Sequence, residues 1–421
     1  MTDLNVTTGS AAARAGEAIE RSRAAALALL KPAPRDLEHG LELHRQSLVI
    51  DAYGFAPRAA VDGDAVAAAL AQGASEVELQ DLMERSRMTG FLVRPEERAE
   101  VDAAWEAAGV TCIFQNAGEE GQAPLRLMKR LAHFTYVADT ARDLFLRATR
   151  PDDIVAAREQ GKRALYLSGN GVPLPQDWVS VEEELRYITI FFELGIRMMH
   201  LTYNRRNMIG DGCAEPANAG LSDFGRAVVA EMNRVGVIVD VAHAGWQTSL
   251  EAARVSTKPV VASHSAACAV HEHIRAKPDD VIRAICDTGG YVGICCIPRF
   301  LGRSGDINAL LDHIDYVART FGVEHVAIGT DVAYASRNEA REQAKIAAAG
   351  GLRRSRPRWE AFWPPEDPAT AARYRQPESA ASLAWTNWPL FTVGLVQRGY
   401  SDAAIQQILG GNVLRVARAV L

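Results

Sequence analysis

The chain has 421 residues, of which 48% are hydrophobic and 23% charged, and a formal net charge of −6 at pH 7. A chain of this length and apolar content can bury a large core, and a negative charge without any run of Lys or Arg argues against nucleic acid as a partner. No stretch reaches the roughly 18 apolar residues of a membrane span, and the N-terminus lacks a signal-peptide pattern, so we expect a cytoplasmic protein without membrane association.

The first predicted element is a helix over residues 11–30. The sequence AAARAGEAIERSRAAALALL consists of strong helix formers with Leu and Ile on one stripe, and the prolines of KPAP end it. We therefore assign residues 1–45 to an N-terminal helical extension. This helix is expected to brace the outside of the protein or to contact another subunit.

Eight short runs rich in β-branched residues follow, separated by longer stretches of helical period. The predicted strands cover residues 47–53, 110–116, 163–168, 196–203, 236–243, 258–264, 289–296 and 325–331. Alternating strands and helices favour an α/β fold with a parallel sheet covered by helices. A count of eight strands favours closure into a TIM-type (β/α)8 barrel over an open doubly wound sheet, and the lack of a GxGxxG motif after the first strand also disfavours the open sheet.

Residues 46–421 are expected to form this single barrel domain, with one long excursion at about residues 335–385. The excursion is basic, contains several prolines and includes the aromatic residues Trp359, Phe362 and Trp363. Excursions on this face of a barrel often become lids or subunit contacts. A buried aromatic cluster without such a role is the alternative.

Polar residues gather at the carboxyl ends of the predicted strands, where barrel enzymes place their chemistry. In chain order they are Asp51, Tyr53, Asn116, Ser168, Asn170, Tyr203, Asp240, His243, His264 and Asp331. A lone histidine at such a position is more often a hydrogen-bonded structural group. Because His243 and His264 end successive strands and Asp331 ends the last one, the pattern instead favours a site for a divalent metal ion.

Several longer segments carry a family resemblance. They are LTYNRRNMIGDGC, GVIVDVAHAGWQTSLEAA, KPVVASHSAACAV, HIRAKPDDVIRAI and NWPLFTVGLVQRGYSDAAIQQILGGNVLRV, and the resemblance covers most of residues 46–421. They resemble the membrane dipeptidase (renal dipeptidase) family of the amidohydrolase superfamily. The resemblance implies a (β/α)8 barrel that carries two zinc ions, cleaves dipeptides or related amides, and forms a homodimer.

The same resemblance implies roles for four residues. His243 and His264 match the two histidines of one metal ion, and Asp331 matches the aspartate that binds the other ion and transfers protons. Arg275 matches the arginine that binds the carboxylate of the substrate.

Three departures from the family pattern fall in one pocket. The family's His-x-Asp after the first strand is replaced by Tyr53 and Phe55, and Phe55 cannot bind a metal ion. Asn170 takes the place of the bridging glutamate, and an amide oxygen is a weak and neutral zinc ligand. Tyr203 replaces the substrate-contacting histidine of the family's L-T-H motif. We interpret this clustering as a rebuilt site.

Charge limits the number of metal ions in the rebuilt site. The matched positions retain one carboxylate, Asp331, beside neutral imidazoles, and desolvating a second dication without an anion would cost many kcal/mol. The sequence therefore predicts at most one zinc ion, bound by His243 and His264, with Asn170, Asp331 or water completing the ligand set. Because such ligands bind zinc loosely, a pocket without metal is the alternative.

Other candidate residues also have structural interpretations. Arg275 could form a surface salt bridge, although its planar guanidinium suits a substrate carboxylate. Tyr53 and Tyr203 could each pack in the barrel with a satisfied hydroxyl group, or contact the substrate. Asn170 could be an ordinary turn residue between two glycines.

The leading hypothesis is a zinc-assisted hydrolase of a small amide, either dipeptide-like or an N-acyl amino acid. Asp331 would pass a proton from the attacking water to the departing amine, Arg275 would bind the substrate carboxylate, and Tyr203 would donate a hydrogen bond to the oxyanion. Tyr53 and Asn170 would contact the substrate.

Two other hypotheses belong to different classes. The first is a metal-free or metal-optional enzyme, tautomerase-like or lyase-like, that acts on a specialised metabolite. Its proton-transfer set would be Tyr53, Tyr203, His243, His264 and Asp331. The second is a barrel that binds a ligand without catalysis, because a fold alone establishes no activity.

Overall fold

The structure is a computed structural model that describes residues 3–118, 123–352, 363–364, 374 and 377–421, with the side chains of residues 3–15 left out of the description. Trp359 and Phe362, two of the three aromatic residues predicted to serve as a lid or contact, lie outside the described residues. Among the described residues, no helix combines the length and apolarity needed to cross a bilayer.

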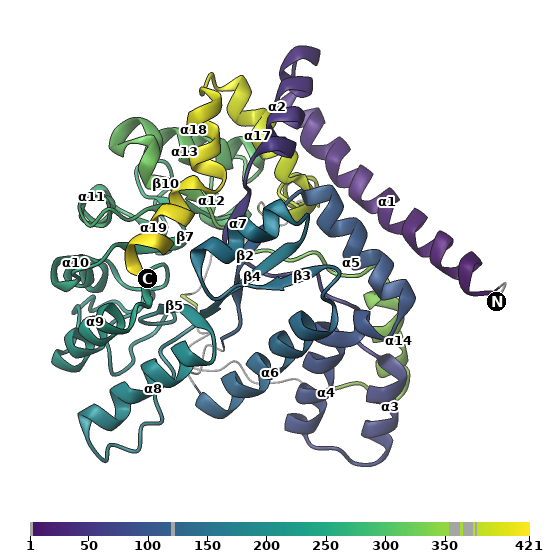
Figure 1. Cartoon of the computed structure of the whole chain (residues 1–421), viewed down its shortest axis with the longest axis horizontal. Coiled ribbons are helices and arrows are strands. Elements are labelled where there is room, and N and C mark those ends of the chain that lie inside the picture. Colours follow the sequence, from purple (N-terminus) through teal and green to yellow (C-terminus); the bar gives the residue numbers. More distant parts are fainter. Residues whose placement is uncertain (1–2, 119–122, 353–362, 365–373, 375–376) are drawn as a thin grey trace.

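Eight parallel strands form the centre of the molecule (Figure 1) and confirm the predicted TIM-type barrel. In sheet order they are β1 (Ile50–Gly54), β2 (Cys112–Asn116), β4 (Arg163–Gly169), β5 (Ile196–His200), β6 (Ile238–Asp240), β7 (Val260–Ala267), β9 (Val292–Ile294) and β10 (Val326–Ile328). Each falls within or overlaps a predicted strand. The last strand returns to the first, because the backbone N–H of Asp331 donates to the carbonyl of Tyr53 at 3.0 Å.

Two additional short strands were not predicted. β3 (Phe145–Arg147) pairs with β4, and β8 (Ala276–Lys277) pairs with β7, both outside the main strand order. Both lie outside the eight β-branched runs from which the other strands were predicted. β8 matters for the site because Arg275 directly precedes it.

Helices surround the barrel (Figure 1). Their bounds are α1 Asp3–Leu30, α2 Pro34–Gln46, α3 Gly63–Ala71, α4 Glu76–Thr89, η1 Gly90–Leu92, α5 Pro95–Ala108, α6 Pro124–Thr140, α7 Pro151–Glu159, α8 Val181–Glu193, α9 Asp223–Val235, α10 Trp246–Val255, α11 Asp279–Asp287, α12 Pro298–Leu301, α13 Ile307–Phe321, η2 Val323–His325, α14 Glu339–Ala348, α16 Pro377–Ser382, η4 Trp385–Asn387, α17 Trp388–Gln397, α18 Asp402–Gln406, η5 Gln407–Gly411 and α19 Asn412–Val420. The excursion predicted after the last strand thus contains α14 and α16.

Local sequence sets many of the helix ends. The side chain of Ser222 accepts a hydrogen bond from the backbone of Gly225 at the start of α9, and Gly236 ends this helix in the left-handed conformation. Asp306 caps α13 in the same manner. Gly236 thereby lets the chain turn directly into β6, which begins at Ile238.

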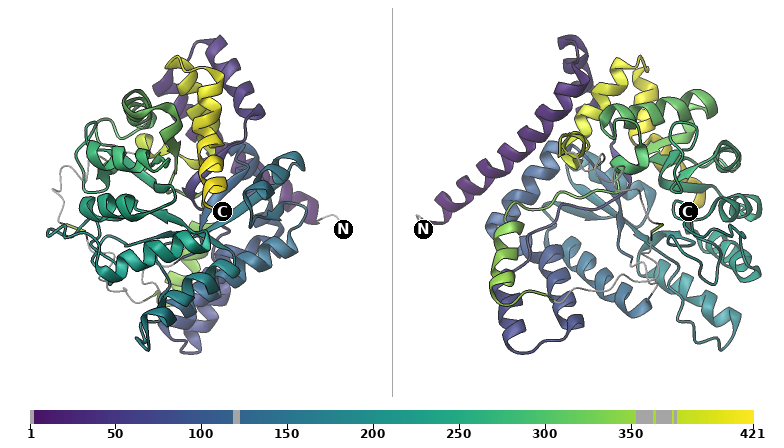
Figure 2. Two further views of the ribbon diagram at one scale, coloured as in Figure 1. Left: turned by 60° about the vertical axis from the view of Figure 1, so that its left-hand side comes forward. Right: turned by 180° about the vertical axis from the view of Figure 1, so that it is seen from behind.

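The predicted N-terminal helix is confirmed and begins earlier, at Asp3. α1 runs along one side of the molecule and its N-terminal end projects beyond the neighbouring helices (Figure 2). Its second half is tied to the C-terminal segment, because the Asn387 side chain donates to the carbonyl of Ser22 at 2.9 Å and Gln397 donates to that of Leu30 at 3.1 Å. The predicted role of an outer brace therefore has intramolecular contacts to support it.

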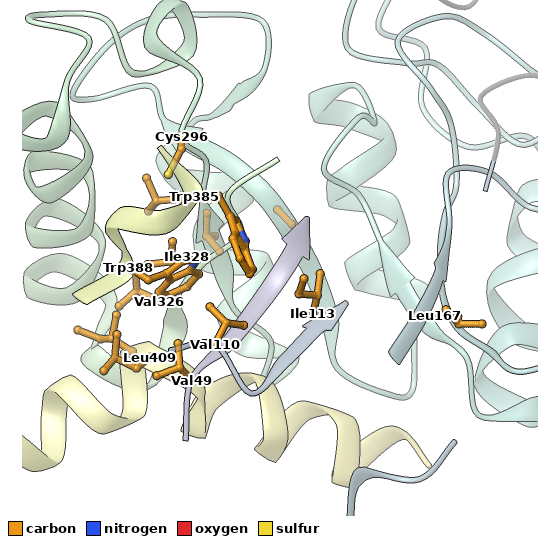
Figure 3. Packing of buried hydrophobic residues seen from close by; sticks show 14 of the residues in the cluster. Val49, Val110, Ile113, Leu167, Cys296, Val326, Ile328, Trp385, Trp388 and Leu409 are labelled. Carbon is orange, nitrogen blue, oxygen red and sulfur yellow. The ribbon is translucent and has the colours of Figure 1, made fainter. Parts of the chain in front are cut away.

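The core has an inner and an outer part. Inside the barrel, apolar residues of the strands pack with Val413, Val416 and Val420, so that α19 covers the end opposite the strand carboxyl termini. Outside it, strand residues pack against the helices, and Figure 3 shows Trp385 and Trp388 of the C-terminal segment in this packing. The indole of Trp385 also donates a hydrogen bond to Asp51 of β1 at 3.1 Å, which anchors this segment to the barrel.

Candidate active site

A cavity of about 210 Å³ opens at the carboxyl ends of the strands. It is lined by Tyr53, Phe55, Asn116, Asn170, Tyr203, His243, Arg275, Ile297, Arg299, Phe300, Asp331 and Trp363. The cavity therefore brings together every residue predicted to contact the substrate, and His264 lies fully buried beside it. Trp363, from the predicted excursion, also lines the cavity.

The strands position these side chains through their ends. Tyr53 and His264 lie within β1 and β7, whereas Asn170, Tyr203 and His243 follow β4, β5 and β6 in the loops. The predicted strands over residues 196–203 and 236–243 were thus too long, since the chain leaves the sheet at His200 and Asp240.

Asp331 follows β10 and has a positive φ of 55°. A left-handed conformation is costly for a residue with a Cβ and persists where surrounding contacts enforce it, often at functional sites. Its backbone hydrogen bond to Tyr53 supplies such a contact. The turn thereby holds the aspartate at the cavity.

His243 and His264 face each other across 3.0 Å between their Nε2 atoms. On the other side of His243, Nδ1 lies 2.8 Å from the side-chain oxygen of Asn204, an acceptor, so His243 carries its proton on Nδ1. Ser263 donates its hydroxyl hydrogen to Asp240 and lies 2.8 Å from Nδ1 of His264. Ser263 must therefore accept from His264, which also carries its proton on Nδ1.

These tautomers leave two unprotonated nitrogens pointing at each other. Burial lowers the pKa of both imidazoles well below the ordinary value, and the positive charge of Arg275 lowers each further, so both rings are neutral. Two facing lone pairs repel unless a cation lies between or beside them. Neutral imidazoles oriented by outer hydrogen bonds are the form in which histidine binds metals.

The residues present fit one zinc ion at this place. Two nitrogens bound to one tetrahedral zinc ion at about 2.1 Å are about 3.4 Å apart, close to the 3.0 Å between the two Nε2 atoms. Asp331 lines the same cavity as His243, but among the described residues Asp331 and the two histidines do not form a group whose ligand atoms all lie within 4.8 Å. The two histidine nitrogens are therefore the part of the donor set that suits a single ion.

The residues do not fit a second ion. Tyr53 donates its hydroxyl hydrogen to the side-chain oxygen of Asn170 at 2.7 Å, and its ring stacks on His264 with centroids 3.9 Å apart. The ring of Phe55 lies edge-on to the ring of Tyr53. The guanidinium of Arg58 lies 4.6 Å from the ring centroid of Phe55. Aromatic rings and a cation in this region exclude a further dication. Asn170 is not among the residues of positive φ, so the glycines beside it do not reflect a left-handed turn.

Tyr203 and Arg275 also line the active-site cavity. The ring of Tyr203 stacks on His243 with centroids 4.1 Å apart. Arg275 is 1% exposed, donates to the carbonyl of His264 at 3.0 Å and lies 5.1 Å from the ring centroid of Phe300. The alternative of a surface salt bridge is therefore wrong for Arg275, whose guanidinium lines the cavity instead.

His200 was not among the predicted site residues. It is fully buried, and its Nε2 lies 2.7 Å from Oδ2 of Asp240. His200, Asp240 and His264 form the one group of three metal-ligating side chains among the described residues whose ligand atoms lie within 4.8 Å of one another, and Asp331 lies outside it. The signal in the sequence was a histidine within the apolar run IRMMHL.

This group shares His264 with the facing histidine pair. Burial raises the pKa of Asp240, but the adjacent His200 and hydrogen bonds from Ser263 and Ala242 outweigh it and hold the pKa below its ordinary value. None of His200, Asp240 and His264 lines the cavity. Asp240 therefore acts as a buried anion that orients Ser263 and, through it, the ring of His264.

The sequence of the chain is similar to that of known dipeptidases. A family model described as membrane dipeptidase, peptidase family M19, matches residues 43–340. Among curated proteins, the chain is 27% identical over 279 residues to "Dipeptidase tcpJ" of Claviceps purpurea, which covers 65% of this chain and 55% of that protein. The chain spans about half the length of the curated relatives it matches.

Solved structures agree on the fold. An amidohydrolase from Pseudomonas aeruginosa superimposes with a TM-score of 0.63 and 25% identity, covering 90% of this chain and 98% of that one. A metallo peptidase from Rhodobacter sphaeroides, liganded with a phosphinate mimic of L-Ala-D-Ala, has a TM-score of 0.62 and 16% identity and covers 89% of this chain and all of that one. At 16% identity, the similarity to the Rhodobacter sphaeroides structure shows a shared fold and nothing more.

Proposed function

Because the chain belongs to the membrane dipeptidase family, we propose that it is a metal-assisted hydrolase of a small amide that carries a carboxylate. The substrate class is a dipeptide-like compound or an N-acyl amino acid. Relatives named as dipeptidases support the hydrolytic reaction, and a buried arginine in a cavity of 210 Å³ supports a small anionic substrate.

The observation that carries the proposal is the pair of Nε2 atoms that face each other 3.0 Å apart. His243 and His264 would hold one zinc ion, with Asp331 available from the same cavity. When bound, the ion supplies Lewis acidity, which polarises a carbonyl and makes water more acidic. Replacement of the second site by Tyr53 and Phe55 supports a limit of one ion.

The protein's own groups perform the remaining tasks. Asp331 takes a proton from the attacking water and returns it to the departing amine. The guanidinium of Arg275 binds the carboxylate of the substrate and so orients the amide. Tyr203 donates its hydroxyl hydrogen to the oxygen on which negative charge develops.

Tyr53 and Asn170 have a positioning role in this proposal. Their hydrogen bond of 2.7 Å holds the tyrosine ring against His264 and closes the region where a second ion would lie. The substrate therefore contacts a tyrosine ring where the family pattern has metal ligands.

The same histidine pair also favours a second candidate, an acid/base enzyme that needs no metal. A single proton between the two Nε2 atoms would relieve their repulsion as a metal ion does, and Tyr53 and Tyr203 stack on the two rings that would share it. Such a set could catalyse a tautomerisation or an elimination.

Elemental analysis of freshly purified protein separates the two candidates. We expect about one zinc ion per chain and loss of amide hydrolysis after chelation, with recovery on adding zinc. Protein that contains no zinc and takes up none on dialysis contradicts the hydrolase proposal. Turnover that chelation leaves unchanged supports the second candidate.

A variant of the proposed proton carrier tests catalysis directly. Asp331→Asn should reduce turnover by a factor of about 10²–10⁴ without lowering the melting temperature. If no member of a panel of dipeptides, N-acyl amino acids and related metabolites is turned over by the wild-type protein, a ligand-binding barrel without catalysis becomes the better interpretation.

A further inference from the structure

A second cavity, which we name the apolar cavity, lies beside the candidate active site. It has a volume of about 330 Å³. Its walls come from residues 18–22 of α1, residues 296–298, residues 332–335 and residues 380–386. Ile297 lines both cavities, and Val332 of the apolar cavity directly follows Asp331 of the active site.

The walls of the apolar cavity are mostly hydrocarbon. Ile19, Leu383 and Trp385 supply large apolar surfaces, and Cys296 and Trp385 from this wall are labelled in Figure 3. Alanines at positions 18, 333 and 384 leave the space between them open. A cavity with walls of this kind favours a hydrocarbon chain over a polar group.

Two of the four walls lie outside the family match. The matched region covers residues 43–340, whereas α1 and residues 380–386 lie before and after it. The apolar cavity is therefore built partly by segments outside the matched region, placed against two loops that also carry active-site residues.

Volume provides a further argument. Cavities that bind small ligands usually measure about 300–1,000 Å³, and the active-site cavity of 210 Å³ falls below this range. With the apolar cavity of 330 Å³, the combined space falls within it. Ile297 lines both cavities and so lies between them.

We infer that the apolar cavity is a subsite for the hydrocarbon chain of the substrate, and that the preferred substrate is an N-acyl amino acid with a medium-length acyl chain. The inference rests on the proposed function and narrows its substrate class. The amino acid carboxylate lies at Arg275, the scissile amide lies between His243 and Asp331, and the acyl chain passes Ile297 into the apolar cavity.

A series of N-acyl derivatives of one amino acid tests the inference. With acetyl, butanoyl, hexanoyl and octanoyl groups, kcat/KM of the wild-type protein should rise by up to about fourfold for each CH₂ group that becomes buried. Ala18→Trp fills the cavity from the surface of α1 and should abolish the rise while leaving the acetyl substrate unchanged.

Ala24→Trp is the matched control, because Ala24 is exposed on the same helix and does not line the cavity. This variant should keep the dependence on chain length. The inference is overturned if wild-type activity is the same for all chain lengths, or if Ala18→Trp retains the wild-type dependence.

Binding distinguishes this inference from the proposed function. If a dipeptide is hydrolysed and none of the series is, the proposed function stands and the inference about the substrate is overturned. If neither the series nor a dipeptide is hydrolysed, the proposed function fails, and calorimetry with N-acetyl and N-octanoyl glycine still shows whether the apolar cavity binds the acyl chain. Tighter binding of the octanoyl compound that Ala18→Trp abolishes supports it. Equal binding of the two compounds, or no binding of either, contradicts it.

Discussion

At the scale of single residues, the site depends on hydrogen bonds one step away from the candidate metal ligands. Asn204 accepts from His243, and Ser263 accepts from His264 while donating to Asp240. These outer partners decide which nitrogen of each ring faces the other histidine, and outer partners of metal-binding histidines commonly affect affinity strongly. The candidate metal site therefore also includes residues that orient the ligands without binding the ion.

Asn204 provides a test of this argument. Its φ is 57°, a conformation that Gly and Asp also tolerate, so Asn204→Gly removes the acceptor without backbone strain. We expect a tenfold to hundredfold loss of zinc affinity, of the order seen for such partners, in a competition titration with a chromophoric chelator.

Asn204→Asp is the matched variant, because a carboxylate still accepts from Nδ1 of His243 and should retain the affinity. If Asn204→Gly binds zinc as tightly as the wild-type protein, the outer hydrogen bond does not orient this ring.

At the scale of elements, α13 supports the strand that carries His264. Nδ1 of His313 accepts from the backbone N–H of Ala267, the last residue of β7, at 3.0 Å, and its Nε2–H donates to the carbonyl of Leu301 at 2.9 Å. Both hydrogen bonds require a neutral ring. Burial lowers the pKa of His313 from 6.5 to about 4.

The depressed pKa of His313 predicts a pH dependence of stability. Below pH 6.5 the unfolded chain binds a proton at this residue and the folded chain does not, so the free energy of unfolding falls as pH drops from 6.5 to about 4. The shift corresponds to about 3 kcal/mol at 1.36 kcal/mol per pKa unit.

Urea unfolding at pH 7.5 and pH 5 measures this effect. His313→Gln retains an amide donor but cannot titrate, and should show a smaller difference in stability between the two pH values than the wild-type protein. An equal difference in both proteins would assign the pH dependence to other groups, such as His44, whose pKa burial also lowers to about 4.

At the scale of the whole molecule, α1 joins the barrel to the C-terminal segment. Ile19, Ala26 and Leu30 are buried, and the hydrogen bonds of Asn387 and Gln397 reach the helix from the other end of the chain. The helix therefore supports the wall that holds Trp385 without contributing to the strand order.

Deletion of residues 1–30 tests this role. The barrel should remain folded, because its strands and α19 make their own core, but loss of the buried face of α1 should lower the melting temperature by at least about 5 °C. Circular dichroism and a thermal melt measure both quantities. A deletion variant with unchanged melting temperature would show that α1 does not stabilise the rest of the protein.

The predicted homodimer also belongs to this scale. We expect light scattering after size exclusion to give twice the mass of the chain, 45.7 kDa. If the deletion variant is monomeric while the full chain is dimeric, the projecting end of α1 takes part in the contact. A monomeric full-length protein contradicts the prediction.

Much of the molecule was predictable from the chain alone. Periodicity and composition are local properties, so eight strands, the first helix and the barrel could be inferred, and the polar residues at strand ends converge in any parallel barrel. The substitutions at Tyr53, Phe55 and Asn170 were visible for the same reason, since each is read against a motif of neighbouring residues.

The remaining features depend on contacts between distant parts of the chain. The tautomers of His243 and His264 follow from partners on other loops, and the contact of His200 with Asp240 joins two strands. The apolar cavity forms where α1 meets residues 380–386. Side-chain direction, burial and enclosed volume arise from packing in three dimensions, and no pattern in a linear sequence carries that information.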